Sequence, residues 1–342
     1  MNWKKRPEGS NWGDFGENDQ IGRMNLLTPG HRLRGIREVR EGIAFTLSLP
    51  LDFPGGNELS PYRKPPRLFT EDRGGAPYYN YKLSCLCADF IDLATDDSVL
   101  LHTQYSTQWD ALSHFGAQFD LDGDGVEKGC YYNGFRADVD LVPPGKGNGP
   151  YARALGIENL AMAGVQGRGV MVDLHRIHGR KRVAVGYDEL MRTMDAQDAH
   201  LEPGDFLVVH TGWAQAVLDM NKSPDGVALR HDLCPVLDGN DPKLLKWIDD
   251  SGLVAICADN FAVEDVYRFE PGGNPATGKR RTSMPLHHLC LFKLGIHLGE
   301  MWYLTDLAAW LAANRRSSFL LTAPPLRLPG SVGSPTTPIA TV

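Results

Sequence analysis

One short segment carries several side chains that could bind a metal ion. Gln104, Gln108, Asp110 and His114 are separated by even numbers of residues. Successive side chains of an extended strand alternate between its faces, so Gln104, Gln108 and Asp110 would share one face. A helix, with about 3.6 residues per turn, would direct Asp110 away from both glutamines. The spacing therefore predicts a strand that runs into a turn at a polar site, and the residue types suggest metal-assisted chemistry.

The donor atoms in this segment bear on which ion could bind. Glutamine offers a neutral amide oxygen, which is a harder and weaker donor than the histidine nitrogen that suits zinc. Manganese, magnesium or calcium would match such oxygens better than zinc does. His114 is of a residue type whose intrinsic pKa lies near neutrality, so it could exchange protons with a substrate or a water molecule.

Composition limits the kind of protein and its partners. The chain has 342 residues, of which 42% are hydrophobic and 23% charged, as in ordinary globular proteins. A net charge of -7 and the lack of a long Lys/Arg block argue against nucleic acid or an anionic membrane surface as a partner. No secretory signal or membrane span is apparent, so a cytoplasmic protein that acts on small molecules is expected. The six cysteines show no paired C-x-x-C spacing, which argues against a disulfide framework.

The elements that must position the polar segment have an α/β pattern. The first hundred residues are rich in Pro and Gly, with strand-like pieces between turns. From Asn159 onward, strands alternate with helices. The predicted strands are 169–174, 206–210, 253–258 and 296–298, and the predicted helices are 187–196, 243–251, 285–294 and 305–313. We expect a single α/β domain over residues 1–342, with an irregular N-terminal arm (about 1–40) and an extended C-terminal tail (about 323–342) at the surface or against a neighbouring subunit.

Several motifs together resemble the cyclase family of metal-dependent hydrolases, which includes bacterial kynurenine formamidase and isatin hydrolase. The opening 11–29 is similar to the family's Trp-Gly…Asn-Leu-Leu-Thr-Pro entry. Residues 204–213 resemble its Gly-Asp…Arg-Thr-Gly-Trp strand, with His210 where Arg is usual, and 288–300 resembles its His-x-x-Leu…Gly-Ile…Glu segment. The central segment resembles the signature His-x-Gly-Thr-His-x-Asp-Ala-Pro-x-His, with Gln104 and Gln108 at its two histidine ligand positions.

The resemblance implies a mixed β/β/α fold, a homodimer or homotetramer, and a divalent ion, Mn²⁺ or Zn²⁺, with Mg²⁺ or Ca²⁺ as further possibilities. Three hypotheses for the metal remain open. Gln104, Gln108 and Asp110 could bind a hard ion, with Glu300 completing the set. In the second hypothesis, only the family's other metal-binding position is kept, and it is built from Asp110, His288 and Glu300. The third hypothesis is that no metal binds.

The resemblance also assigns roles to individual residues. His114 corresponds to the acid/base histidine, and Asp110 to a ligand of the catalytic ion. His288 is expected at the start of a helix preceded by Ser283 and Pro285, where the helix dipole favours a neutral, metal-binding imidazole. Its neighbour His287 is expected to point elsewhere.

Aromatic residues cluster in sequence around these motifs, which suggests a pocket for a ring-bearing substrate. The expected substrate-binding residues are Trp109, Phe115, Tyr132 and Trp302. The function predicted is hydrolysis of an aryl formamide, cyclic amide or lactone by a metal-activated water. The alternative is a non-catalytic small-molecule-binding protein on the same fold.

One other acidic segment resembles a metal site. Asp120-Leu-Asp-Gly-Asp-Gly125 matches the first half of a calcium-binding loop. The twelfth position of that loop would be Tyr131 and not the bidentate glutamate, so an ordinary Asp-Gly turn is favoured.

Overall fold

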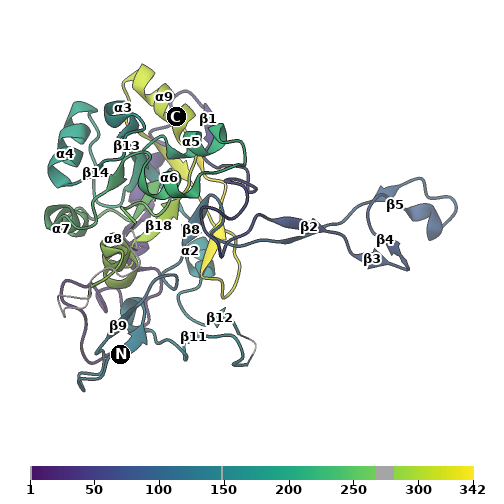
Figure 1. Cartoon of the computed structure of the whole chain (residues 1–342), viewed down its shortest axis with the longest axis horizontal. Helices are drawn as coiled ribbons and strands as arrows, with labels where there is room; N and C mark the ends of the chain where they lie inside the picture. Colours follow the sequence, from purple (N-terminus) through teal and green to yellow (C-terminus); the bar gives the residue numbers. More distant parts are fainter. Residues whose placement is uncertain (1, 148, 267–280) are drawn as a thin grey trace.

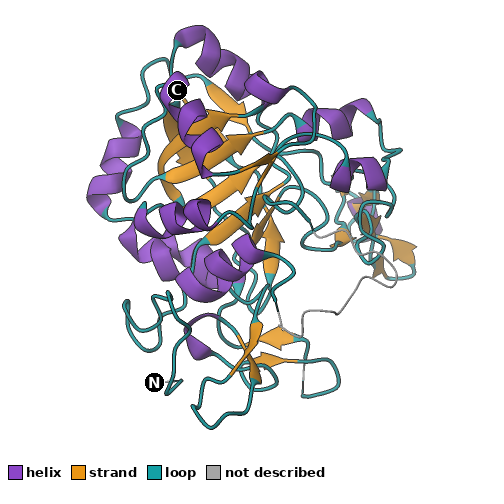
Figure 2. Ribbon diagram, turned by 60° about the vertical axis from the view of Figure 1, so that its left-hand side comes forward, coloured by secondary structure: helices purple, strands orange, loops and turns teal. Residues whose placement is uncertain are grey.

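The structure is a computed structural model that describes residues 2–147, 149–266 and 281–342. Its centre is a curled β-sheet with helices packed around it (Figure 2). Within the described residues this sheet has nine strands, in the spatial order β1 (Ala44–Thr46), β21 (Ile339–Thr341), β19 (Ser318–Thr322), β13 (Gln166–Asp173), β15 (Phe206–His210), β17 (Ala255–Ala258), β18 (His297–Glu300), β8 (Gln108–Asp110) and β20 (Gly333–Pro335).

The centre of the sheet is built from strand–helix–strand units. Strands β13, β15, β17 and β18 are mutually parallel. Helix α4 (Tyr187–Ala196) connects β13 to β15, and α7 (Pro242–Asp250) lies between β15 and β17. The segment from α8 (Pro285–His287) into the π-helix η4 (His288–Leu294) precedes β18. This arrangement confirms the mixed α/β fold that the alternating pattern predicted.

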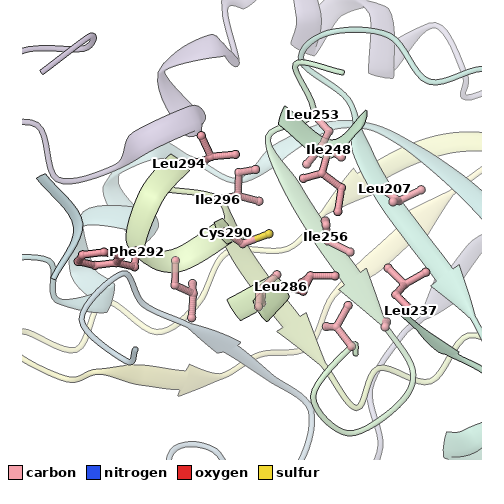
Figure 3. Close-up of a cluster of buried hydrophobic side chains, with 14 of the residues drawn as sticks. Leu207, Leu237, Ile248, Leu253, Ile256, Leu286, Cys290, Phe292, Leu294 and Ile296 are labelled. Carbon is pink, nitrogen blue, oxygen red and sulfur yellow. The ribbon is translucent and has the colours of Figure 1, made fainter. Parts of the chain in front are cut away.

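The central strands are buried on both faces because successive side chains enter two different cores. Val170 and Val172 of β13 join one core with Leu190 of α4. Met171, between them, joins a second core with Leu307 of helix α9 (Thr305–Asn314) on the other side of the sheet. Figure 3 shows part of the first core, where side chains from β15, α7, β17, α8 and η4 meet. The sheet is therefore a rigid platform for residues at its edge.

The remaining elements are short. The other helices are η1 (Gly22–Leu26), α1 (Pro29–Ile36), η2 (Leu83–Cys85), η3 (Tyr132–Gly134), α2 (Ile157–Ala163), α3 (His175–His178), α5 (Trp213–Asp219) and α6 (Gly226–His231). The two-stranded pairs are β2 (Arg67–Phe69) with β7 (Ser98–Leu100), β3 (Asp72–Arg73) with β4 (Ala76–Pro77), β5 (Tyr81–Lys82) with β6 (Leu93–Ala94), β9 (Ala117–Phe119) with β10 (Lys128–Cys130), β11 (Leu141–Val142) with β12 (Tyr151–Ala152), and β14 (Ala184–Val185) with β16 (Val236–Leu237). Among the helices in the described ranges, none combines the length and apolarity needed to cross a bilayer.

Both ends of the chain are more ordered than the sequence predicted. The first part of the C-terminal tail lies at the surface, where Leu326 and Leu328 are exposed. Its last part does not, because β20 pairs with β8 and β21 pairs with β19 inside the main sheet. Ser334, Ala340 and Val342 are fully buried there. The N-terminal arm includes α1, where Thr28 caps the helix by accepting a hydrogen bond from the His31 backbone.

Residues 64–101 form a long protrusion, called here the hairpin extension. Figure 1 shows it leaving the body as the β2–β7 ribbon and ending in a lobe that contains β3 to β6. No residue from 64 to 101 is buried. The sequence pattern predicted irregular structure wrapped on a core for this region, whereas the extension stands away from the core.

Candidate metal centre

The polar side chains come together on two neighbouring strands, β18 and β8, near one edge of the main sheet. Strand β8 pairs antiparallel with β18, and Gln108 lies directly opposite Glu300. Directly opposed residues share a face of the sheet, and so do residues two apart along a strand. Gln108, Asp110 and Glu300 therefore point to the same side, as the even spacing predicted for Gln108 and Asp110.

A histidine from the neighbouring helix completes the cluster. Candidate ligand atoms of Asp110, His287 and Glu300 all lie within 4.8 Å of one another. The Nε2 atom of His287 is 3.2 Å from Glu300 Oε1. Gln108 Nε2 donates to Glu300 Oε2 at 3.0 Å and lies 3.5 Å from Asp110 Oδ1. All four residues are buried.

Two acceptor atoms of this cluster lack a partner. Gln108 Oε1 and Asp110 Oδ2 are buried, and neither accepts a hydrogen bond from any described residue. A buried, unpaired carboxylate oxygen is costly, and so is a buried amide oxygen. A cation bound by Asp110, His287 and Glu300 would satisfy Asp110 Oδ2. Gln108 Oε1 would join it after a turn of the amide, whose nitrogen faces Glu300 in this structure, so the donor set fits a divalent ion.

Glu264 determines how His287 is presented to the cluster. One carboxylate oxygen, Oε1, accepts hydrogen bonds at 2.8 Å from both the backbone N–H and the ring Nδ1 of His287. The other oxygen accepts from the backbone of Leu286 at 2.9 Å. Glu264 thus caps the first turn of α8 and fixes the imidazole with Nε2 facing Glu300. Sequence spacing gave no sign of this role, because Glu264 is brought to His287 only by the fold.

Burial and mutual charge shift the pKa values of this cluster. Burial, and then the charge of Glu300, raise the pKa of Asp110 well above its usual value. Burial alone would lower the pKa of His287, but hydrogen bonds to Glu264 and Glu300 raise it to about 10. Burial would raise the pKa of Glu300, yet its bond to the charged His287 lowers it. Without an ion, His287 is therefore an imidazolium between two glutamates.

His114 lies at the rim of the cluster, where a substrate could reach it. Its side chain is 24% exposed, and its Nε2 atom is 3.8 Å from Asp110 Oδ1. Its Nδ1 atom is 3.3 Å from the side-chain amide of Gln104. Burial, followed by the positive charge of Arg63, lowers the pKa of His114 to about 4, so the ring is neutral at pH 7.

Gln104 contacts His114 and not the carboxylates. It precedes the regular part of β8, so the alternation of faces that places Gln108 and Asp110 does not extend to it. Its amide oxygen accepts a bond from Thr103 at 2.7 Å, and its backbone carbonyl accepts one from Arg63 at 2.8 Å. The even-offset prediction therefore requires correction at Gln104. The sequence analysis did not single out Arg63, which fixes the backbone of Gln104 through this hydrogen bond.

The prediction for His287 and His288 was wrong: His287, and not His288, lies in the cluster of possible metal ligands. His287 faces Asp110 and Glu300, whereas His288 stacks 4.9 Å from the ring of Phe292 and lines a neighbouring cavity that Phe115 also lines. Consecutive helical side chains diverge by about 100°, so only one of the pair can face the cluster. The sequence placed the helix correctly, but its rotation is set by Glu264.

Of the four aromatic residues expected at the site, only Phe115 lies there. Its ring is 5.6 Å from that of His287. Trp109 points to the opposite face of β8, where it packs edge-on at 5.2 Å against Trp302 in the second core. Tyr132 is fully buried and donates to Asp19 at 3.2 Å. The expectation that Trp109, Tyr132 and Trp302 line a substrate pocket is corrected: they support the strands and the N-terminal segment.

The acidic 120–125 segment is a surface turn neutralised by cations. Asp122 pairs with Lys128 at 2.5 Å and with Arg136 at 2.6 Å. Asp124 lies 3.3 Å from the same lysine. These pairs occupy the carboxylates that a calcium ion would need, in agreement with the Asp-Gly turn that the sequence favoured.

Comparisons with known proteins are consistent with this geometry. Residues 45–265 match a family model described as a putative cyclase. No curated protein sequence gives a match. A crystal structure described as a novel cyclase is 31% identical, aligns over 97% of this chain and 99% of its own, and has a TM-score of 0.76.

Two isatin hydrolases are more distant structural neighbours. One, bound to the product analogue thioisatinate, is 13% identical over 92% of this chain and 99% of its own, with a TM-score of 0.52. Isatin hydrolase A from Labrenzia aggregata, bound to benzyl benzoate, is 12% identical over 90% of this chain and 95% of its own, with a TM-score of 0.55. At these identities the likeness shows a shared fold.

Proposed function

This chain belongs to the putative cyclase family, and from that premise and its site we propose that it is a metal-dependent hydrolase. The ion would be held by Asp110, Glu300 and His287, with the amide oxygen of Gln108 as a further ligand. The observation that carries the proposal is the pair of unsatisfied buried oxygens, Gln108 Oε1 and Asp110 Oδ2, beside the three clustered ligands. This set retains the second metal hypothesis, with His287 in place of His288, and adds Gln108 from the first.

The donor types narrow the choice of ion. Two carboxylates, one imidazole and one amide oxygen form a mixed oxygen–nitrogen set, which suits Mn²⁺ or Zn²⁺ better than Ca²⁺, which takes oxygen ligands. The two carboxylates balance a dication in a buried site. When bound, such an ion supplies a polarised carbonyl and a water molecule of lowered pKa.

The chain's own residues would prepare the site for that ion. His287 must give up the proton on Nε2 before this atom can be a ligand, while Nδ1–H continues to donate to Glu264. Glu264 therefore keeps the imidazole in one tautomer and one orientation. Asp110, whose pKa is raised by burial and Glu300, also binds as the deprotonated carboxylate.

His114 is the proposed general acid/base. It can accept a proton at Nε2 only when Nδ1 carries the ring proton, and this requires the amide oxygen of Gln104 to face Nδ1. Amide orientation is assigned from neighbouring hydrogen bonds, and the hydroxyl of Thr103 can donate to the oxygen or accept from the nitrogen. Gln104 can thus support either tautomer and keeps His114 facing Asp110.

An aromatic cavity beside the cluster favours a ring-bearing substrate. It has a volume of about 540 Å³, and Phe115, Phe119, Phe292 and His288 are among its lining residues. Phe115 connects this cavity to His287. The proposed substrates are an aryl formamide, a cyclic amide or a lactone, each with a carbonyl carbon that water can attack.

The test combines metal content with a substrate panel. Protein purified without chelators is expected to contain about one equivalent of Mn²⁺ or Zn²⁺, and to hydrolyse at least one aryl formamide, isatin or lactone. Chelation should remove activity, and the correct ion should restore it. Protein that binds panel members but hydrolyses none, with the ion fully loaded, would instead support a non-catalytic binding protein.

A further inference from the structure

A second cavity lies beside the carboxyl end of β13, apart from the metal centre. Its volume is about 270 Å³, and its walls come from β13, α3, the last turns of α4 and α9, and the residues that lead into β19. Figure 1 shows α3, α9 and β13 close together in the upper part of the body. Strands β15 and β17 separate β13 from β18, which carries Glu300. In α/β sheets, ligands commonly bind outside the carboxyl ends of the strands, so this cavity is a candidate binding site.

Oppositely charged side chains line this cavity without pairing with one another. Arg176, Arg315 and Arg316 contribute three guanidinium groups, and Asp173 and Asp198 contribute two carboxylates. In the described part of the chain, no ion pair joins any of these arginines to either aspartate, and Arg176 and Arg315 form no ion pair at all. Charged groups of both signs are therefore available to a ligand.

Asp173 has one carboxylate oxygen in use and one free. Oδ1 lies 2.8 Å from His210 Nδ1 and accepts from the backbone of Arg176 at 3.0 Å. Among residues 2–147, 149–266 and 281–342, none donates to Oδ2. Burial would raise the pKa of Asp173, but the hydrogen bond and the charge of His210 lower it, so the group is a carboxylate at pH 7. Its side chain is 17% exposed, which leaves Oδ2 accessible to a cationic group.

Arg316 carries a guanidinium group that its neighbours satisfy only in part. Nη2 donates to the carbonyl of Ser318 at 3.2 Å and lies 3.7 Å from a carboxylate oxygen of Glu38. Nη1 is buried and donates to no described residue. A buried donor without an acceptor is costly. After a small rotation of the guanidinium group, a carboxylate in the cavity would supply that acceptor.

The rest of the lining is apolar and firmly held. The apolar lining residues are Met171, Ala196, Ala308, Leu311 and Ala312. The side chain of Gln197 accepts from the Asp173 backbone N–H and donates to its carbonyl, both at 2.8 Å. Ser317 Oγ donates to the carbonyl of Asp198 at 2.9 Å. The cavity is thus preformed, and it is smaller than the roughly 300–1,000 Å³ usual for drug-sized ligands, so a small metabolite would fit it.

We propose that this cavity binds a small α-amino acid with an apolar side chain. The carboxylate of the ligand would accept hydrogen bonds from Arg176 and Arg315, with Arg316 behind them. Its ammonium group would donate to Oδ2 of Asp173, and its side chain would lie against Leu311. A carboxylate without an ammonium group would leave the aspartate unpaired, and an amine without a carboxylate would leave the arginines unpaired. Binding here needs no metal ion, so it can be measured whether or not the metal centre is active.

Isothermal titration calorimetry of the full chain tests this binding. L-alanine, L-valine and L-leucine are each titrated at up to millimolar concentration. Isocaproate, which lacks the ammonium group of L-leucine, and isoamylamine, which lacks its carboxylate, are titrated in parallel. At least one of the amino acids should bind with a stoichiometry of one per chain. Isocaproate and isoamylamine should bind at least about tenfold more weakly than L-leucine, because each loses its charge-assisted hydrogen bonds at one end.

Variants locate the binding in the cavity. The double change Arg176→Gln and Arg315→Gln should weaken amino-acid binding at least about tenfold. Ala312→Phe, at an exposed position of α9 that lines the cavity, should abolish binding by filling the space. Arg192→Gln on α4, where the side chain is 71% exposed, and Ala313→Phe, exposed but not lining the cavity, are the matched controls and should bind like the wild type. Circular dichroism should show that all variants are folded.

Three results would overturn the proposal. The first is that none of the three amino acids binds to the wild type. The second is that isocaproate or isoamylamine binds as tightly as L-leucine, because the site would then recognise a single charge. The third is that the arginine double variant and Ala312→Phe, both folded, bind the amino acid like the wild type, because the ligand would then lie elsewhere.

Discussion

The metal centre and the 120–125 turn are both groups of carboxylates, but their surroundings differ in every respect that matters for ion binding. At the centre, Asp110 is buried, has one unpaired oxygen and has a raised pKa. In the turn, hydrogen bonds from Arg136 and Lys128 lower the pKa of Asp122, and its side chain is partly exposed. Acidic composition alone does not make a site. Burial together with unsatisfied acceptors distinguishes the first group from the second.

Removing one carboxylate charge from the metal centre and one from the 120–125 turn should give the largest difference in metal binding and activity. Asp110→Asn should abolish both metal binding and hydrolysis, because it removes the anionic ligand at the middle of the cluster. Asp122→Asn, the matched control, should keep both and lose only a little stability, since its ion pairs are at the surface. Metal analysis and hydrolysis rates of the two variants check this. Equal metal content in both would remove the basis of the comparison.

The next largest effect is expected at the rim of the centre. His114→Ala should keep the ion but reduce kcat by roughly a hundredfold or more, the usual size of an acid/base contribution. His200, which pairs with Asp198 at the surface, offers a control in His200→Ala. Full activity of His114→Ala from pH 6 to 9 would exclude the proposed role.

The support of His287 provides a smaller and more specific test. Glu264→Gln retains size and one acceptor but removes the charge that orients the imidazole. We expect metal affinity to fall by about 10–100-fold, as is usual when a carboxylate behind a histidine ligand is lost. Competition with a chromogenic chelator measures this without turnover. An unchanged affinity would show that Glu264 serves only to cap α8.

The pH dependence of the metal-free protein follows from the same residues. The folded pKa of His287, about 10, lies above its ordinary value of 6.5. The stability that this histidine contributes is therefore complete below about pH 6.5 and is lost as the pH rises through 10. The Tm of chelator-treated wild type should fall more over this range than that of His287→Gln. Parallel Tm curves would show that His287 does not gain a proton on folding.

Regular elements could be predicted from the sequence because local pattern determines them. The bounds of α4 and β15 were predicted correctly, and the period of two in β8 placed Gln108 and Asp110 on one face. The same period also implied that Trp109 faces the other side, away from Asp110. Its assignment to the substrate pocket conflicted with that geometry.

The features that could not be predicted from the sequence depend on contacts between distant parts of the chain. The rotation of the helix that carries His287 is fixed by Glu264, and no local pattern distinguishes His287 from His288. The C-terminal residues form β20 only because β8 offers an unpaired edge, with Ser334 opposite Trp109. The hairpin extension could not be anticipated either, because its strands are short and its apolar residues resemble those of a core.

The smallest expected effect is on metal affinity and concerns Gln104, which was predicted as a metal ligand but contacts His114 instead. Gln104→His would restore one histidine of the family signature, but the side chain of residue 104 contacts His114 and Thr103. Zinc affinity should therefore stay within about threefold of wild type, far less than one added imidazole ligand would give. The pH profile of kcat should still change, because the new ring would alter which nitrogen of His114 carries the proton. A large gain in zinc affinity would mean that Gln104 can turn toward Asp110 when an ion is bound, and the division of roles between Gln104 and Gln108 would fail.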